Sequence, residues 1–177
     1  MKRMYTPPSP KNIFMGLFLC FFAAVIVVSP LPMLYRSMII LFIAYLAASY
    51  GGMPFAYIVV ILVPPLGLLK HDDSWLIFLP MIISSGLLAM LGLEYSWRYA
   101  ALLISPFLYV IPQLFVWKVS EHRLFAIEIP WQPSATRWLI IHAFVAGAGV
   151  LTMFFLDRKR QKLAKRLANK TRNRSKS

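Results

Sequence analysis

Residues 12–29 read NIFMGLFLCFFAAVIVVS, eighteen residues without a charged side chain. An α-helix needs about 20 mainly apolar residues to cross a hydrocarbon layer roughly 30 Å thick. This run therefore predicts a membrane-spanning helix, and the nearby Pro30 and Pro32 predict its end. A secretory signal peptide is a poor interpretation, because no small-residue cleavage site follows the run and further apolar runs do.

Five more apolar runs follow, separated by prolines, glycines or charged residues. The predicted spans are residues 12–29, 34–50, 55–69, 75–93, 99–117 and 138–156. Helices are expected, since an open strand edge in lipid leaves backbone N–H and C=O groups unpaired. The runs are also continuous, unlike the alternating segments of a β-barrel. The predicted fold is an all-α, polytopic integral membrane bundle of six transmembrane helices.

The composition excludes most other classes of protein. The 177 residues are 59% apolar and 14% charged, with a mean hydropathy of +0.67. Soluble domains average about 45–50% apolar and about 25% charged residues. A soluble domain of this size cannot bury so many apolar side chains. A water-soluble enzyme and a disordered chain are both excluded.

The net charge of +13 lies mainly at the two ends of the chain. We predict a cytoplasmic basic arm at residues 1–11, a transmembrane domain at 12–156 with an outer connector at 118–137, and a cytoplasmic polybasic tail at 157–177. With both termini inside, 14 Lys and Arg residues face the cytoplasm and five face outward. The positive-inside rule favours this N-in/C-in topology. The expected location is the inner (plasma) membrane of a bacterium.

Aromatic anchors agree with this topology. Tryptophans favour the two membrane–water interfaces. All five tryptophans fall at predicted span ends or in a predicted loop, and we interpret them as interfacial anchors; they are Trp75, Trp97, Trp117, Trp131 and Trp138.

Charged residues near the spans are the first functional candidates. Glu94 and Arg98 are four residues apart, the spacing of one helical face. We expect an interfacial ion pair; a buried pair would instead mark coupling to protons or substrate. Arg36 lies near the start of the second span. We expect its side chain to snorkel to the outer interface, with anion binding as the alternative.

Other polar and helix-breaking residues lie deeper. Gln113 and His142 are expected to form hydrogen bonds between helices, the usual role of such side chains in membranes. The dipeptide Pro64-Pro65 must bend or stop the third helix. Either that helix ends at the outer interface, or a broken helix lines a binding site whose freed carbonyls are satisfied there.

Pairs of small residues four apart predict close helix packing, either within the bundle or against another chain. Three spans carry such a pair: Ala44 with Ala48, Ser85 with Ala89, and Ala143 with Gly147.

No catalytic motif is present, so an enzyme is not expected and neither is a cofactor. Ser84 and Ser85 resemble an intramembrane nucleophile only loosely, because nothing orients His142 as a base. Charged residues of the predicted outer loops lack metal-site spacing, so no metal is expected there; they are His71, Asp72, Asp73, Glu121 and His122.

Three functions are compatible with the sequence. The preferred one is a non-catalytic subunit or scaffold that packs against other integral membrane proteins. The alternative is a small-solute binding or transport component with its site among the third, fifth and sixth helices. An intramembrane enzyme has the least support. The polybasic tail should attract anionic lipid, whereas nucleic acid is an unlikely partner without a base-reading motif.

Overall fold

The computed structural model describes residues 10–70, 73–96, 99–121 and 134–174, with the side chains of 161 and 163–174 outside that part. Six helical segments in these residues are long and apolar enough to cross a membrane. Five are α-helices: α1 (Pro10–Val28), α2 (Met33–Tyr50), α4 (Asp73–Tyr95), α5 (Ala101–Glu121) and α6 (Ala135–Arg174). The predicted six-helix membrane fold is confirmed.

The third span is built from three consecutive pieces rather than one α-helix. Gly52 begins it at φ 102°, a left-handed conformation that glycine adopts without strain. The pieces are α3 (Met53–Tyr57), the π-helical η1 (Ile58–Leu62) and the 3₁₀-helical η2 (Pro64–Lys70). The chain therefore does not stop at Pro64-Pro65 but continues as a tighter helix to Lys70.

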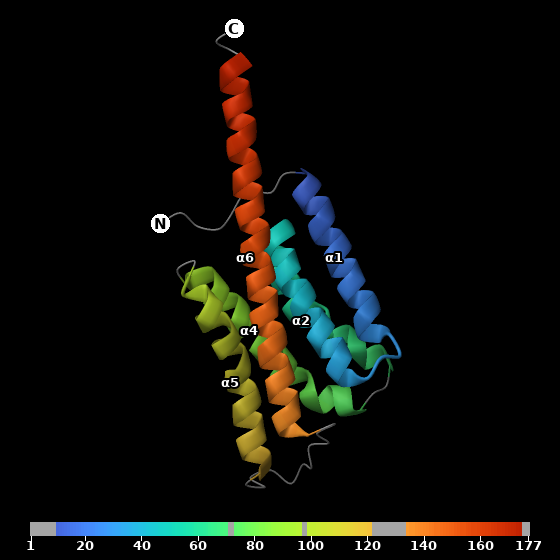
Figure 1. Cartoon of the computed structure of the whole chain (residues 1–177). Helices are drawn as coiled ribbons and strands as arrows, with labels where there is room; N and C mark the ends of the chain where they lie inside the picture. Colours follow the sequence, from blue (N-terminus) through green and yellow to red (C-terminus); the bar gives the residue numbers. More distant parts are fainter. Residues whose placement is uncertain (1–9, 71–72, 97–98, 122–133, 175–177) are drawn as a thin grey trace.

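The helices form one bundle around α2 (Figure 1). α6 packs on both α2 and α5, α4 packs on α5, and α1 packs on α2 and on the third span. α6 also extends beyond the bundle at the end where α1 begins (Figure 1). We call this the proximal end, and we call the opposite end, where α1 ends and α6 begins, the distal end.

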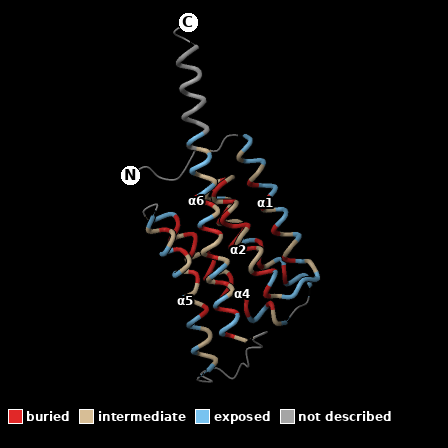
Figure 2. Tube along the Cα trace, in the orientation of Figure 1, coloured by how far each residue is buried: buried red, intermediate tan, exposed pale blue. Residues whose placement is uncertain are grey.

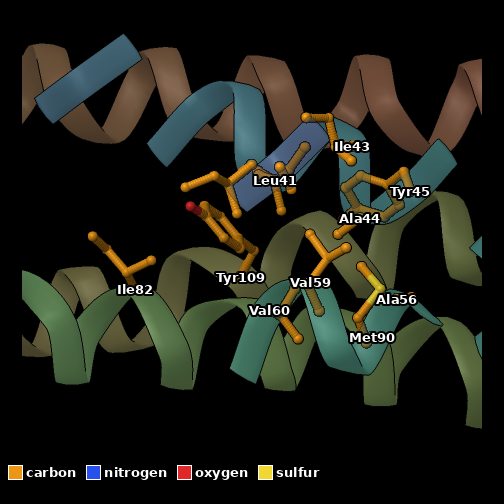
Figure 3. Packing of buried hydrophobic residues seen from close by; sticks show 14 of the residues in the cluster. Leu41, Ile43, Ala44, Tyr45, Ala56, Val59, Val60, Ile82, Met90 and Tyr109 are labelled. Carbon is orange, nitrogen blue, oxygen red and sulfur yellow. The ribbon is translucent and has the colours of Figure 1, made fainter. Parts of the chain in front are cut away.

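Burial separates inner from outer helix faces (Figure 2). The core consists largely of residues from α2, α4 and the third span, and Figure 3 shows Leu41, Tyr45, Val59 and Met90 packed within it. Large aromatic side chains point outward instead, among them Phe14, Phe21, Phe107 and Phe144, each at least 67% exposed. Lipid is the medium that accepts such faces.

One glycine allows α6 to approach α2 closely. A Cβ atom at Gly149 would lie 2.3 Å from Cδ2 of Tyr45, which is completely buried. The Tyr45 hydroxyl lies 2.8 Å from Ser105 Oγ, which donates to the carbonyl of Ala89. This contact chain links α2, α5 and α4 through the middle of the bundle.

Element ends differ from those predicted. α5 runs to Glu121 and α6 begins at Ala135, so both ends of the predicted connector are helical, while residues 122–133 lie outside the described part. α6 passes the predicted boundary at 156 and continues to Arg174 because neither glycine nor proline follows Gly149. Most of the basic arm, residues 1–9, also lies outside the described residues.

Candidate functional site

Buried polar side chains gather in the distal half of the bundle. Arg36, Ser37, Gln113 and His142 are each at most 1% exposed. Arg36 and Ser37 belong to the first turns of α2, Gln113 to the distal half of α5, and His142 to the early turns of α6. Three of the residues singled out from the sequence therefore lie in one region, and this region is the candidate site.

Arg36 is held inside the protein. Its Nη1 donates to the carbonyl of Val27 at 3.2 Å, and its guanidinium carbon lies 4.6 Å from the ring centroid of Trp75. A cation over an indole face is attracted by the ring quadrupole. The predicted snorkelling of Arg36 is therefore wrong. Its guanidinium contacts the end of α1 and the start of α4 inside the bundle instead of extending to the outer interface.

Two tryptophans also differ from their predicted role. Trp75 is 0% exposed and Trp138 is 1% exposed, so neither is an interfacial anchor on the surface of the bundle. Trp75 Nε1 donates to the carbonyl of Pro64 at 2.8 Å. Trp138 stacks on Phe78 with ring centroids 5.2 Å apart. Both indoles are structural parts of the core.

His142 forms the interhelical hydrogen bond expected of it. Its Nδ1 lies 2.9 Å from the carbonyl oxygen of Trp138, and its Nε2 lies 2.9 Å from Ser37 Oγ. A carbonyl oxygen only accepts, so Nδ1 carries a proton. In the neutral ring Nε2 is then an acceptor, and the single proton of the Ser37 hydroxyl faces two acceptors, Nε2 and the carbonyl oxygen of Leu34, each 2.9 Å away. The ring stacks with Trp138, at a centroid distance of 4.5 Å, and with Tyr109, at 5.9 Å.

The proline break packs beside this cluster. Pro64 is buried, and its carbonyl is the acceptor for Trp75. Gly67, three residues on, lies so close to Trp75 that a Cβ atom there would be 2.3 Å from Nε1. Lys70 closes the segment by donating to the carbonyl of Ser29 at 3.0 Å. These contacts tie η2 to α1 and α4.

A small cavity lies at the break. Its volume is about 10 Å³, and it is lined by Ser37, Val60, Pro64, Gly86 and Tyr109 together with leucine and isoleucine side chains of α2 and α4. Room for one water molecule needs about 10–15 Å³ of probe-occupied volume. Small-molecule sites are usually about 300–1,000 Å³, far larger than this cavity. The space therefore suits a single water-sized group.

Gln113 lies next to the cluster and bonds to its own helix. Its Nε2 donates to the carbonyl of Tyr109 at 3.5 Å, and its Oε1 has no hydrogen-bond partner in the part of the chain that is described. The structure therefore shows Gln113 within α5 rather than bonded to another helix.

Glu94 is far from this region, at the proximal end of α4. Its Oε2 accepts a hydrogen bond of 2.5 Å from the hydroxyl of Tyr57, and its side chain is exposed. Arg98, its predicted partner, lies outside the described residues, so the ion pair stays a prediction. Tyr57 was missed because no periodic pattern relates two residues on different spans.

Polar contacts at the proximal end also fix where α6 leaves the bundle. Ser49 Oγ donates to Asp157 Oδ1 at 3.4 Å, and Arg160 donates to the carbonyl of Ser49. The guanidinium of Arg160 lies 4.3 Å from the ring centroid of Tyr50. Residues just beyond the last apolar turn thus bind the end of α2.

Among the residues whose placement is described, no three side chains of His, Cys, Asp and Glu converge as metal ligands do. The class that fold and site together define is a polytopic, all-helical membrane protein with a tightly packed polar cluster at its distal end. No protein-family model matches the chain, and no match is found among curated proteins or among solved structures.

Proposed function

We propose that this protein is a non-catalytic subunit or scaffold that packs against other integral membrane proteins. The proposal rests on one observation: the polar side chains buried at the distal end make their contacts within this chain. Arg36, Ser37 and His142 all bind other parts of this chain. A transport or catalytic site needs polar groups aimed at a space that can hold its substrate, and the cavity of about 10 Å³ beside them is too small for one.

The outer surface supports the same function. One small-residue pair on α6 is open: a Cβ atom at Gly147 would meet nothing within 4 Å. Its neighbours Phe144 and Leu151 are 76% and 50% exposed. By contrast, Ala44 and Ala89 are completely buried, so those two small-residue faces are used within the bundle. α6 therefore keeps a face on which another membrane helix can pack closely.

Photo-crosslinking in the native membrane tests this function. A photoreactive residue replaces Phe14 of α1, Phe107 of α5 or Phe144 of α6, all strongly exposed, and the buried Met90 serves as control. We expect one defined membrane protein to be captured from one helix face and not from the others or from Met90. Adducts with lipid alone at all three faces would reject the subunit function.

A small-solute binding or transport component is the second candidate. The observation in its favour is the broken third span, because discontinuous helices form many transporter sites. The cavity among α2, the third span, α4 and α5 would have to open to admit a solute. Saturable binding of a solute by a purified monomer, lost on changing Tyr109, would favour this function over the first.

The same proposal includes the topology, the membrane and the lipid partner of the protein. Both termini face the cytoplasm, the membrane is the inner membrane of a bacterium, and the polybasic tail contacts anionic lipid. The support is the charge of the chain: ten of its 19 Lys and Arg residues lie in 158–176.

A further inference from the structure

The prolines of the third span leave the backbone carbonyls of Val60 and Ile61 without a helical donor, and of these two residues only Val60 is buried. In helices, the carbonyl of Val60 can accept from the N–H of residue 63, 64 or 65. The N–H of Val63 bonds to Ile58 at 3.2 Å, and residues 64 and 65 are prolines, which have no N–H. Val60 is 3% exposed, so its carbonyl needs a partner inside the protein.

Val60 lines the cavity of about 10 Å³, and two hydroxyl-bearing residues line it with Val60. Ser37 Oγ carries one proton and lies 2.9 Å from both the carbonyl oxygen of Leu34 and His142 Nε2, and a lone pair of its oxygen can still accept a hydrogen bond. Tyr109 is 2% exposed, and Figure 3 shows its hydroxyl oxygen pointing toward Leu41, another lining residue. A phenol can donate one hydrogen bond.

We propose that one water molecule binds in this cavity, donating to the Val60 carbonyl and to Ser37 Oγ and accepting from the Tyr109 hydroxyl. These are three bonds, the number that a buried water typically makes. The water joins the third span to α2 and α5 at the point where the prolines interrupt the helix. The proposal does not depend on whether the protein is a subunit or a transporter.

A water fits this place better than an ion does. The volume matches one water molecule and leaves no room for a hydrated ion. No lining residue carries a carboxylate, so a cation would be bound by neutral oxygens without a compensating negative charge.

X-ray radiolytic hydroxyl labelling of the full chain in detergent tests the proposal, because bound water generates radicals next to the side chains it touches. Tyr45 is the matched control: it is also buried, but its hydroxyl bonds to Ser105 and it does not line the cavity. We expect Tyr109 to be oxidised severalfold faster than Tyr45. Equal rates would mean a dry cavity and would overturn the proposal.

The acceptor is tested by returning donors to the third span. The double variant Pro64→Ala/Pro65→Ala supplies backbone N–H groups for the Val60 carbonyl. Oxidation of Tyr109 should fall to the rate of Tyr45 in this variant and stay high in the control variant Pro80→Ala, whose proline lies exposed in α4. Unchanged oxidation in the double variant would contradict the role of Val60. If the double variant does not fold, the comparison of Tyr109 with Tyr45 in the natural chain still decides.

Discussion

The two ends of the bundle treat polar side chains in opposite ways. At the distal end, Arg36, Ser37 and His142 are buried among indole rings. At the proximal end, Glu94 is exposed and Asp157 is only half-buried, and their partners Tyr57 and Ser49 lie in the last turns of α3 and α2. The distal polar groups therefore belong to the core, whereas the proximal ones lie at the surface of the bundle, where water can reach them.

This difference has a physical origin. A polar group surrounded by protein must keep its partners, since losing one leaves an unsatisfied group in a low-dielectric interior. A polar group at an interface can replace a lost partner by water. Equal chemical changes at the two ends should therefore differ in cost.

The largest expected effect concerns the compartment that each end of the bundle faces, because a cysteine at that end is either labelled from outside or not labelled at all. In a Cys20→Ala background, Leu69→Cys places a thiol at the distal end and Tyr95→Cys places one at the proximal end; the natural side chains are 72% and 80% exposed. Since both termini are proposed to be cytoplasmic, a membrane-impermeant maleimide should label only the distal cysteine in intact cells. The proximal cysteine should react after permeabilisation. The reverse pattern would invert the proposed topology.

Trp75→Ala should be the most destabilising substitution at the distal end. It removes a fully buried indole, its hydrogen bond to Pro64 and the ring beneath Arg36. Loss of a buried aromatic costs about 3–5 kcal/mol in the free energy of unfolding. The change in the free energy of unfolding is measured by unfolding both proteins in mixed micelles.

The neighbouring variant Leu76→Ala is the matched control for Trp75→Ala, because Leu76 is 56% exposed and faces outward. Its cost should be far smaller. Similar losses for both substitutions would show that Trp75 is no more important to the core than a side chain on the lipid-facing surface.

The sequence was sufficient to predict the six spans, but it did not predict that buried polar side chains cluster at the distal end. Runs such as residues 12–29 and the tail charges follow from bilayer thickness and lipid charge, both of which act on whole segments. The side of each helix that faces the core cannot be predicted in the same way. In lipid both faces of a helix are apolar, so no amphipathic pattern marks the face that carries Arg36 or Trp138. The contacts of Trp75 with Pro64 and of Ser37 with His142 depend on packing between segments that are separate in the sequence. The spacing of residues along the chain does not predict such packing.

Ser37→Ala should have an intermediate effect. It removes the hydroxyl that bonds to His142 Nε2 and leaves a buried ring nitrogen without that partner. Interhelical hydrogen bonds in membranes contribute about 0.6 kcal/mol on average and up to about 1.7 kcal/mol. We expect a loss near the upper end because the ring is completely buried. Ser84→Ala is the control, since among the described residues Ser84 bonds only within its own helix, to the carbonyl of Met81 at 3.2 Å. A larger loss for Ser84→Ala than for Ser37→Ala would refute a core role for the cluster.

Tyr57→Phe at the proximal end should have the smallest effect of the four. It removes the hydroxyl that donates to the exposed Glu94 and keeps the ring. Water can reach Glu94 and replace the lost donor, so the free energy of unfolding should change by at most about 0.5 kcal/mol. The same unfolding measurement applies, with Tyr95→Phe as control, because Tyr95 is 80% exposed. A loss as large as that of Ser37→Ala would mean that the Tyr57–Glu94 contact is shielded from water, and the contrast between the two ends would then fail.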